Sequence, residues 1–113
     1  MNNSFNFDDG IQENYMIPKV LIGNEKYKKL NSSAVLLYSI LLDEMQEKSK
    51  NLGWVDDAGN LYVIFSSQKM SDILNIGSSK LSNIKKQLIQ YDLIEINRGG
   101  IGEYDKIFVK KAV

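Results

Sequence analysis

The sequence predicts an α+β domain, mainly α-helical, arranged as a winged helix-turn-helix. Three observations predict this fold class. Residues 32–50 predict a long helix whose first half is apolar on nearly every side, which is typical of a central helix. Two shorter amphipathic segments separated by Asn75–Gly77 indicate a helix-turn-helix. Two alternating segments around a glycine-rich loop then indicate a C-terminal β wing.

Length and composition restrict the class of protein. A chain of 113 residues can form one hydrophobic core but hardly two domains. It has no cysteine and no histidine, which removes disulfides, the usual zinc ligands and the usual general base. We therefore expect no enzyme, no metal site and no cofactor. Without a membrane-length apolar run or a signal-peptide pattern, we also expect a cytoplasmic protein that does not contact membranes.

The net charge of zero hides an uneven distribution. Residues 1–65 hold six lysines and nine carboxylates, a net charge of −3. Residues 66–113 hold eight basic and five acidic side chains, a net charge of +3. The basic excess therefore falls in the half that contains the predicted helix-turn-helix and wing, which favours a polyanionic partner for that half.

The N-terminal residues 1–12 are polar and lack a long pattern, so we expect a flexible arm followed by a single domain over residues 13–113. Phe5 and Phe7 alternate, and a docking arm that packs on a partner is therefore the alternative to a frayed terminus.

The segment before the central helix predicts three short elements. Residues 14–17 predict a strand, and Pro18 suits the first turn of a short helix that directs Val20, Leu21 and Ile22 inward. Residues 25–30 predict another short helix, anchored by Tyr27 and Leu30.

The central helix is expected to begin at a cap formed by Asn31 or Ser32, and Leu41 is expected to be fully buried at its middle. After it, residues 54–65 predict a β-hairpin with Gly59 in the turn.

The helix-turn-helix is expected to begin at a serine cap, Ser66 or Ser67, and its first helix to bury Met70, Ile73 and Leu74. In the break, Asn75 and Gly77 can both take a positive φ.

The second helix is expected to run from a cap at Ser78 to about Tyr91 and to bury one stripe made of Leu81, Ile84 and Leu88. Its opposite face carries only lysine, serine, asparagine and glutamine, and no carboxylate lies between Ile73 and Tyr91. Such a face suits a helix that reads base edges in DNA. The alternative is a plain solvated face, although an ordinary exposed face mixes both charge signs.

The wing is predicted from a strand over residues 93–97, a loop over residues 98–103 and a last strand that begins at Tyr104 or Lys106 and runs through Val109. Arg98 is the only arginine and stands before two glycines, so the loop could lay it on the DNA backbone or in the minor groove. A plain flexible turn is the alternative.

The predicted DNA-binding residues therefore lie on the second helix and in the wing. They are Ser78, Ser79, Lys80, Ser82, Asn83, Lys86 and Gln87 on the helix, and Arg98, Gly99, Gly100 and Lys106 in the wing.

Several stretches, in their order, resemble the N-terminal domain of replication initiator A proteins from theta-replicating plasmids of Gram-positive bacteria. The stretches are Tyr15–Lys19, Leu30–Asp43, Gly53–Asp57, Asn60–Phe65, Gly77–Lys80 and Gln87–Glu95, within a resemblance that covers about residues 13–110. No single motif is diagnostic, and the order of the motifs carries the resemblance.

The resemblance implies sequence-specific binding of double-stranded DNA at repeated sites of a plasmid origin, and pairing with further copies, most simply as a homodimer. Host replication proteins would be engaged only through a C-terminal region that this sequence does not contain. The helix has lysines where many relatives have arginines, so the preferred bases do not transfer. A winged-helix transcriptional repressor, or a winged helix used only for protein contact, are the alternatives.

Overall fold

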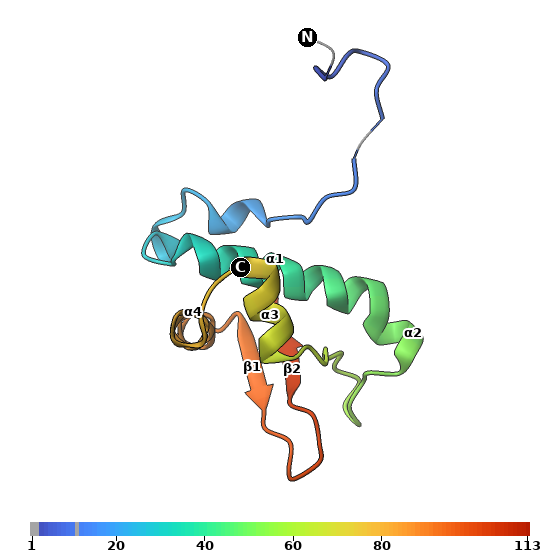
Figure 1. The fold of residues 1–113 in the computed structure, drawn as a ribbon, viewed down its shortest axis with the longest axis vertical. Coiled ribbons are helices and arrows are strands. Elements are labelled where there is room, and N and C mark those ends of the chain that lie inside the picture. Colours follow the sequence, from blue (N-terminus) through green and yellow to red (C-terminus); the bar gives the residue numbers. More distant parts are fainter. Residues whose placement is uncertain (1–2, 11) are drawn as a thin grey trace.

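The computed structural model describes residues 3–10 and 12–113 and has a mainly helical fold with one small sheet (Figure 1). In chain order the elements are η1 (Lys19–Leu21), η2 (Glu25–Tyr27), α1 (Ser32–Glu44), η3 (Met45–Ser49), α2 (Lys50–Leu52), α3 (Ser67–Leu74), α4 (Ser78–Gln90), β1 (Ile94–Asn97) and β2 (Lys106–Val109). The two strands are antiparallel, with Ile96 opposite Ile107. The predicted fold class is confirmed. Within the described ranges, no helix combines the length and apolar character that crossing a bilayer requires.

The central helix is formed by α1, the π-helical turn η3 and α2, which follow one another without a break. It begins where the side chain of Asn31 accepts a hydrogen bond from the amide of Ser33 at 2.8 Å, and it ends before Gly53, whose φ is +71°. This is the Asn31 cap that the sequence predicts, and the helix extends two residues beyond residue 50. Leu41 is completely buried, as predicted, and α1 packs against α3, α4 and β2.

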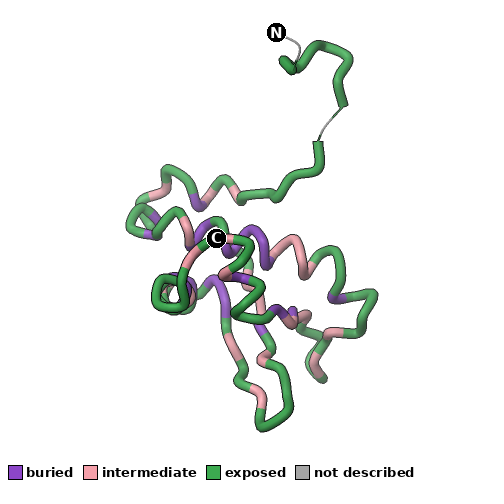
Figure 2. The backbone as a smooth tube through the Cα atoms, in the orientation of Figure 1, coloured by how far each residue is buried: buried purple, intermediate pink, exposed green. Residues whose placement is uncertain are grey.

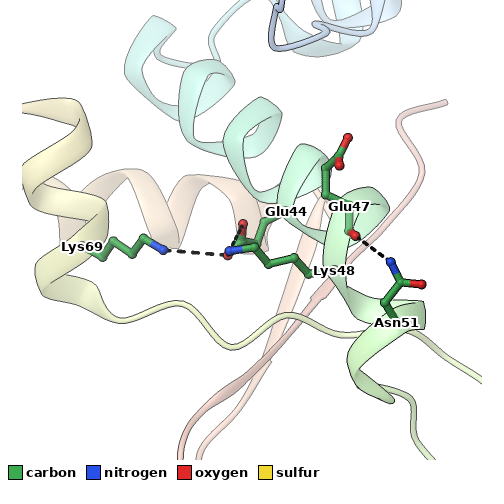
Figure 3. Close-up of polar contacts among 5 residues, drawn as sticks. All are labelled: Glu44, Glu47, Lys48, Asn51 and Lys69. Carbon is green, nitrogen blue, oxygen red and sulfur yellow. Dashed lines mark hydrogen bonds and ion pairs between the residues drawn. The ribbon is translucent and has the colours of Figure 1, made fainter.

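The π-helical turn connects the central helix to the rest of the domain. Ser49 is fully buried there, and its hydroxyl donates a hydrogen bond to the carbonyl oxygen of Tyr62 at 2.6 Å. One turn earlier, the Glu44 carboxylate lies between the ammonium groups of Lys48, at 3.3 Å, and of Lys69 on α3, at 3.9 Å (Figure 3). These contacts fix the helix to α3 and to the chain segment that precedes it.

The core lies where α1, α3, α4 and the sheet meet, and the loop between the strands stands outside it (Figure 2). The most deeply buried apolar side chains are Ala34, Leu37, Tyr38 and Leu41 of α1, Met70 of α3, Leu81, Ile84 and Leu88 of α4, and Val63, Leu93, Ile94 and Ile107 around the sheet. One core therefore fixes the helix-turn-helix and the base of the wing in a single unit.

The N-terminal segment differs from its prediction. Residues 14–17 form no strand, and η1 is a single 3₁₀ turn, which buries Leu21 but leaves Ile22 63% exposed. Val20 is partly buried against the core, so the predicted inward direction was wrong only for Ile22, which follows the turn. The next helix ends at Tyr27 rather than at residue 30, but both of its predicted anchors, Tyr27 and Leu30, are buried.

The arm predicted over residues 1–12 includes residues 1, 2 and 11, which lie outside the described residues. Its described part has no helix or strand, extends away from the domain (Figure 1) and leaves Phe5 and Phe7 exposed. The domain limits at residues 12 and 13 stay a prediction.

The hairpin predicted over residues 54–65 is reduced to one bridge, between Val55 and Leu61. The Asp56 carboxylate accepts hydrogen bonds from the amides of Ala58 and Asn60, at 3.0 and 2.8 Å, and this local side-chain bonding replaces a regular strand ladder. Two residues after Leu61, Val63 pairs with Ile107 on β2 through backbone hydrogen bonds of 2.8 and 3.0 Å. The segment thus extends the sheet by one bridge.

The helix-turn-helix begins as predicted, because Ser66 caps α3 by accepting a hydrogen bond from the amide of Lys69 at 3.1 Å. Met70 is buried, Leu74 is partly buried, and Ile73 is 44% exposed. The prediction that Ile73 is buried was wrong, since α3 is short and only one side of it contacts α1 and α4.

The turn between the helices uses one left-handed residue. Asn75 has a φ of +54°, whereas Gly77 has a φ of −79° and does not use the freedom of glycine. Gly77 is also the residue that precedes the first turn of α4, so Ser78 lies inside the helix and is not its cap. One left-handed residue suffices to end α3 and redirect the chain.

Candidate nucleic-acid interface

The orientation of α4 follows from its buried stripe. Leu81, Ile84 and Leu88 are at most 3% exposed, which confirms the predicted inner face. At the end of the helix, the half-buried Tyr91 ring lies 5.9 Å from the ring of Tyr27, between centroids. Because helix side chains repeat every 3.6 residues, these contacts direct the opposite face of α4 away from the core.

The outward face of α4 is polar and basic. Ser79, Lys80, Ser82, Asn83 and Lys86 are all exposed. Within residues 3–10 and 12–113, neither lysine of this face forms an ion pair with a carboxylate. Two ammonium groups, two hydroxyl groups and one amide group are therefore available to a ligand along about two turns of helix.

Two predicted residues of α4 have other surroundings. Gln87 is half-buried, and its side-chain oxygen accepts a hydrogen bond from the amide of Asn31 at 2.9 Å, which joins α4 to the start of α1. Ser78 opens the helix and is exposed at the end nearest the turn.

The base of the wing is closed by Asp105. One carboxylate oxygen accepts a hydrogen bond from the Gly99 amide at 3.0 Å, and the other lies 3.2 Å from the Arg98 guanidinium. A Cβ on Gly99 would lie 2.6 Å from the carbonyl oxygens of Glu103 and Tyr104, so the loop crosses itself closely at this residue. Gly100 accepts a hydrogen bond from the Glu103 amide at 3.0 Å and is exposed.

A groove separates the helix-turn-helix from the wing. It is lined by Ser67 at the start of α3, Ser82, Lys85 and Lys86 of α4, Ile96 of β1, and Arg98. The Lys85 ammonium donates a hydrogen bond to the Ser67 hydroxyl at 2.7 Å. Burial, and to a lesser degree the positive charge of Arg98, lower the pKa of Lys85, while the Asp105 charge partly offsets them. The groove is therefore a place where positive charge is poorly solvated and an anion would be favoured.

The structure brings four of the predicted residues together in the groove and places others elsewhere. Ser78, Ser82, Lys86 and Arg98 line the groove. Lys106 lies elsewhere. Alternation along the antiparallel pair places it with Phe108, on the sheet face opposite to Ile96, and its ammonium lies 5.0 Å from the centroid of the Tyr62 ring. A DNA contact by Lys106 stays a prediction without support from this arrangement.

Three residues of the interface were missed by sequence reasoning, namely Ser67, Lys85 and Asp105. Lys85 follows Leu81 by four residues and precedes Leu88 by three, so its position beside the buried stripe could have shown that it borders the core. Asp105 could not have been recognised in this way, because its pairing with Arg98 depends on the path of the wing loop.

The fold is shared with known proteins. The family model described as "Replication initiator protein A (RepA) N-terminus" matches residues 13–113. A solved structure described as "Structure of Rep-DNA complex" is 34% identical in sequence and superposes with a TM-score of 0.79. The match covers 90% of this chain and 78% of the chain in that structure. Another, described as "Structure of MDR initiator", is 33% identical with a TM-score of 0.77, over 90% of this chain and 79% of its own.

The chain is also similar to a curated protein of Lactobacillus helveticus described as a "41 kDa protein". The two are 32% identical over 92 residues, which is 81% of this chain. The matched part spans 26% of the length of that relative.

Proposed function

Because the chain belongs to the family of replication initiator protein A N-termini, we propose that it is an origin-binding domain. It binds double-stranded DNA at repeated sites of a plasmid origin, with α4 in the major groove and the wing against the neighbouring backbone. As plasmid DNA lies in the cytoplasm, the domain acts there. Its role is binding rather than catalysis.

The observation that carries this proposal is the outward face of α4. It presents Lys80, Asn83 and Lys86 to solvent without a carboxylate partner in the described part of the chain, and Arg98 of the wing stands beside it. A helix of this kind fits the width of the major groove, where asparagine pairs with adenine and lysine contacts guanine or phosphate. The similarity to a solved structure described as a Rep–DNA complex supports DNA binding.

The proposal is tested by nuclease footprinting over the origin and the initiator gene of the plasmid that encodes this chain. Protected, regularly spaced repeats in the origin are expected. Binding constants measured over a series of salt concentrations should fall steeply, because each neutralised phosphate releases a counterion. Absence of protection anywhere on the plasmid would contradict the proposal.

Two alternatives give different results in the same experiments. A transcriptional repressor would protect a promoter and leave the origin repeats free. A winged helix used only for protein contact would show no salt-dependent DNA binding. The family and its DNA-bound structural neighbour favour the origin-binding domain.

The same proposal includes self-association. Exposed apolar side chains, among them Phe7, Tyr15 and Met16, gather in the N-terminal segment and offer a surface that a second copy can cover. Repeated sites on DNA suit a homodimer with two-fold symmetry. Contacts with host replication proteins are assigned to regions outside residues 1–113.

A further inference from the structure

We propose that the groove between α3, α4 and β1 is a phosphate subsite, in which Lys85 and Arg98 bind one backbone phosphate of DNA. In the free protein, Asp105 forms an ion pair with Arg98, and the phosphate replaces it. The inference rests on the proposed DNA binding and adds two roles to it: Lys85 of α4 binds phosphate together with Arg98, and Asp105 competes with the phosphate for Arg98.

Cationic groups from two elements converge on the groove. Arg98 reaches the groove from the end of β1, and Lys85 reaches it from α4, with the Ser67 hydroxyl 2.7 Å from the lysine ammonium. Lys86 lines the same groove. Guanidinium, ammonium and hydroxyl groups together are the donors that bind phosphate oxygens in protein–DNA interfaces.

The surroundings of Lys85 solvate its ammonium group poorly. Lys85 is half-buried and borders the apolar side chains of Leu81 and Ile96, which line the groove with it. In the described residues no carboxylate lies within 4.0 Å of its ammonium, and its hydrogen-bond partner is the neutral Ser67. A poorly solvated cation without a counterion gains more from an incoming phosphate than an exposed lysine does.

Asp105 forms an ion pair with Arg98 that another anion can replace. Its carboxylate contacts Arg98 with one oxygen and the Gly99 amide with the other. The arginine side chain is 76% exposed and the aspartate side chain 42% exposed, so this ion pair contributes little to stability and can be exchanged for another anion. The Gly99 hydrogen bond keeps the carboxylate in place when Arg98 turns to the phosphate.

The groove face of the wing therefore has two states. In free protein, Arg98 pairs with Asp105, while Lys85 and Lys86 of the groove have no carboxylate within 4.0 Å in the described residues. In the complex, a phosphate bridges Lys85 and Arg98. The cost of separating Arg98 from Asp105 weakens binding to every duplex equally, because no base is involved.

A double-mutant cycle tests the competition. We would titrate a fluorescein-labelled duplex of mixed sequence, at low salt, with the wild-type chain, Asp105→Asn, Arg98→Ala and the double variant. Asp105→Asn should tighten binding severalfold, because asparagine still accepts the Gly99 hydrogen bond but no longer competes for Arg98. In the Arg98→Ala background the same change should have much less effect.

Glu103→Gln is the matched control, because it removes one negative charge from the same loop at an exposed residue that does not contact Arg98. It should tighten binding less than Asp105→Asn. The competition would be overturned if Asp105→Asn and Glu103→Gln raised the affinity equally, because overall charge would then explain the effect. It would also be overturned if Asp105→Asn raised the affinity equally in the wild-type and Arg98→Ala backgrounds. Weaker binding by a folded Asp105→Asn variant would overturn it as well.

A second experiment locates the phosphate. Lys85→Ala should weaken binding about tenfold and lower the slope of log affinity against log salt by about one, while Lys29→Ala, a lysine on an exposed surface turn, should leave both unchanged. Duplexes that carry single methylphosphonates should include one position at which Lys85→Ala and Arg98→Ala both lose their effect. If no position does so, the two side chains do not share a phosphate.

The two proposals can fail separately. If the wild-type chain binds no duplex at low salt, the proposed function fails. If it binds, and the Lys85 and Arg98 variants bind as tightly as the wild-type chain, only the phosphate subsite fails.

Discussion

Adjacent residues on α4 meet different surroundings, and this decides which of them a ligand can reach. Lys85 turns toward the groove and Ser67, whereas Lys86 is exposed and Gln87 is bound to the start of α1. Three consecutive polar residues therefore have three different roles. A substitution in this stretch has to be interpreted from the contacts of the individual side chain, since the sequence shows the same polar chemistry at each.

Asn83 lies on the outward face, one turn before Gln87 and three residues before Lys86. Asn83→Ala should weaken binding to the protected origin sequence by about 1–3 kcal/mol, the value of a lost bidentate contact to adenine, without changing binding to a scrambled duplex. Fluorescence anisotropy with both duplexes measures the difference. Lys86→Ala serves as the comparison, because a phosphate contact should weaken both duplexes alike. If Asn83→Ala binds both duplexes like the wild-type chain, α4 does not read bases through this side chain.

At the scale of elements, the wing depends on one close approach. A Cβ added to Gly99 would lie 2.6 Å from the carbonyl oxygens of Glu103 and Tyr104. A Cβ added to Gly100 would contact only the Glu103 side chain, at 3.9 Å. The two glycines are neighbours in the chain, but only the first is required by sterics.

Gly99→Ala should therefore destabilise the domain by roughly 1–3 kcal/mol, as expected when a side chain is forced into occupied space, and should displace Arg98 from Asp105. Gly100→Ala should cost little and is the matched control. Urea unfolding midpoints and the amide NMR signal of Gly100 or Asp105 would report both effects. Coincident midpoints for the two variants would show that the loop opens without cost.

The elements that sequence predicts well are those with local causes. The stripe of α4 and the caps at Asn31 and Ser66 follow from spacing and side-chain chemistry within a few residues, and all three are confirmed. The bridge between Val63 and Ile107 joins residues far apart in the chain, and no local pattern indicates it. The missing strand at residues 14–17 has the same origin, since a strand needs a partner that the sequence alone does not identify.

At the scale of the whole molecule, the central helix packs against both the helix-turn-helix and the wing. Leu41 is completely buried in α1, which contacts α3, α4 and β2. Leu41→Ala should lower the free energy of unfolding by roughly 2–5 kcal/mol through lost burial and the cavity left behind. Leu36→Ala, at a position of the same helix that is 49% exposed, is the control and should cost clearly less. Urea denaturation compares the two, and equal midpoints would contradict the central position of Leu41.

The candidate site was predictable only in part, because part of it depends on how separate elements pack together. The outward residues of α4 follow from its own periodicity, so sequence could place Lys80 and Asn83 on one face. The groove forms only when the sheet packs beside the helix-turn-helix, and this packing brings Lys85 and Arg98 to one place from different elements. No local sequence pattern indicates that side chains from different elements will lie together after tertiary packing.

The N-terminal segment exposes aromatic side chains that the core does not cover. Phe5 is 70% exposed, Phe7 fully exposed and Tyr15 55% exposed, although aromatic side chains gain most from burial. We expect a second copy to cover this N-terminal segment, so that sedimentation at tens of micromolar gives the mass of a dimer. Phe5→Ser combined with Phe7→Ser should shift the distribution toward the monomer, whereas Ile101→Ser, at a fully exposed apolar residue of the wing loop, should not. A monomeric mass for the wild-type chain, with and without DNA, would show that the arm has no partner in a second copy.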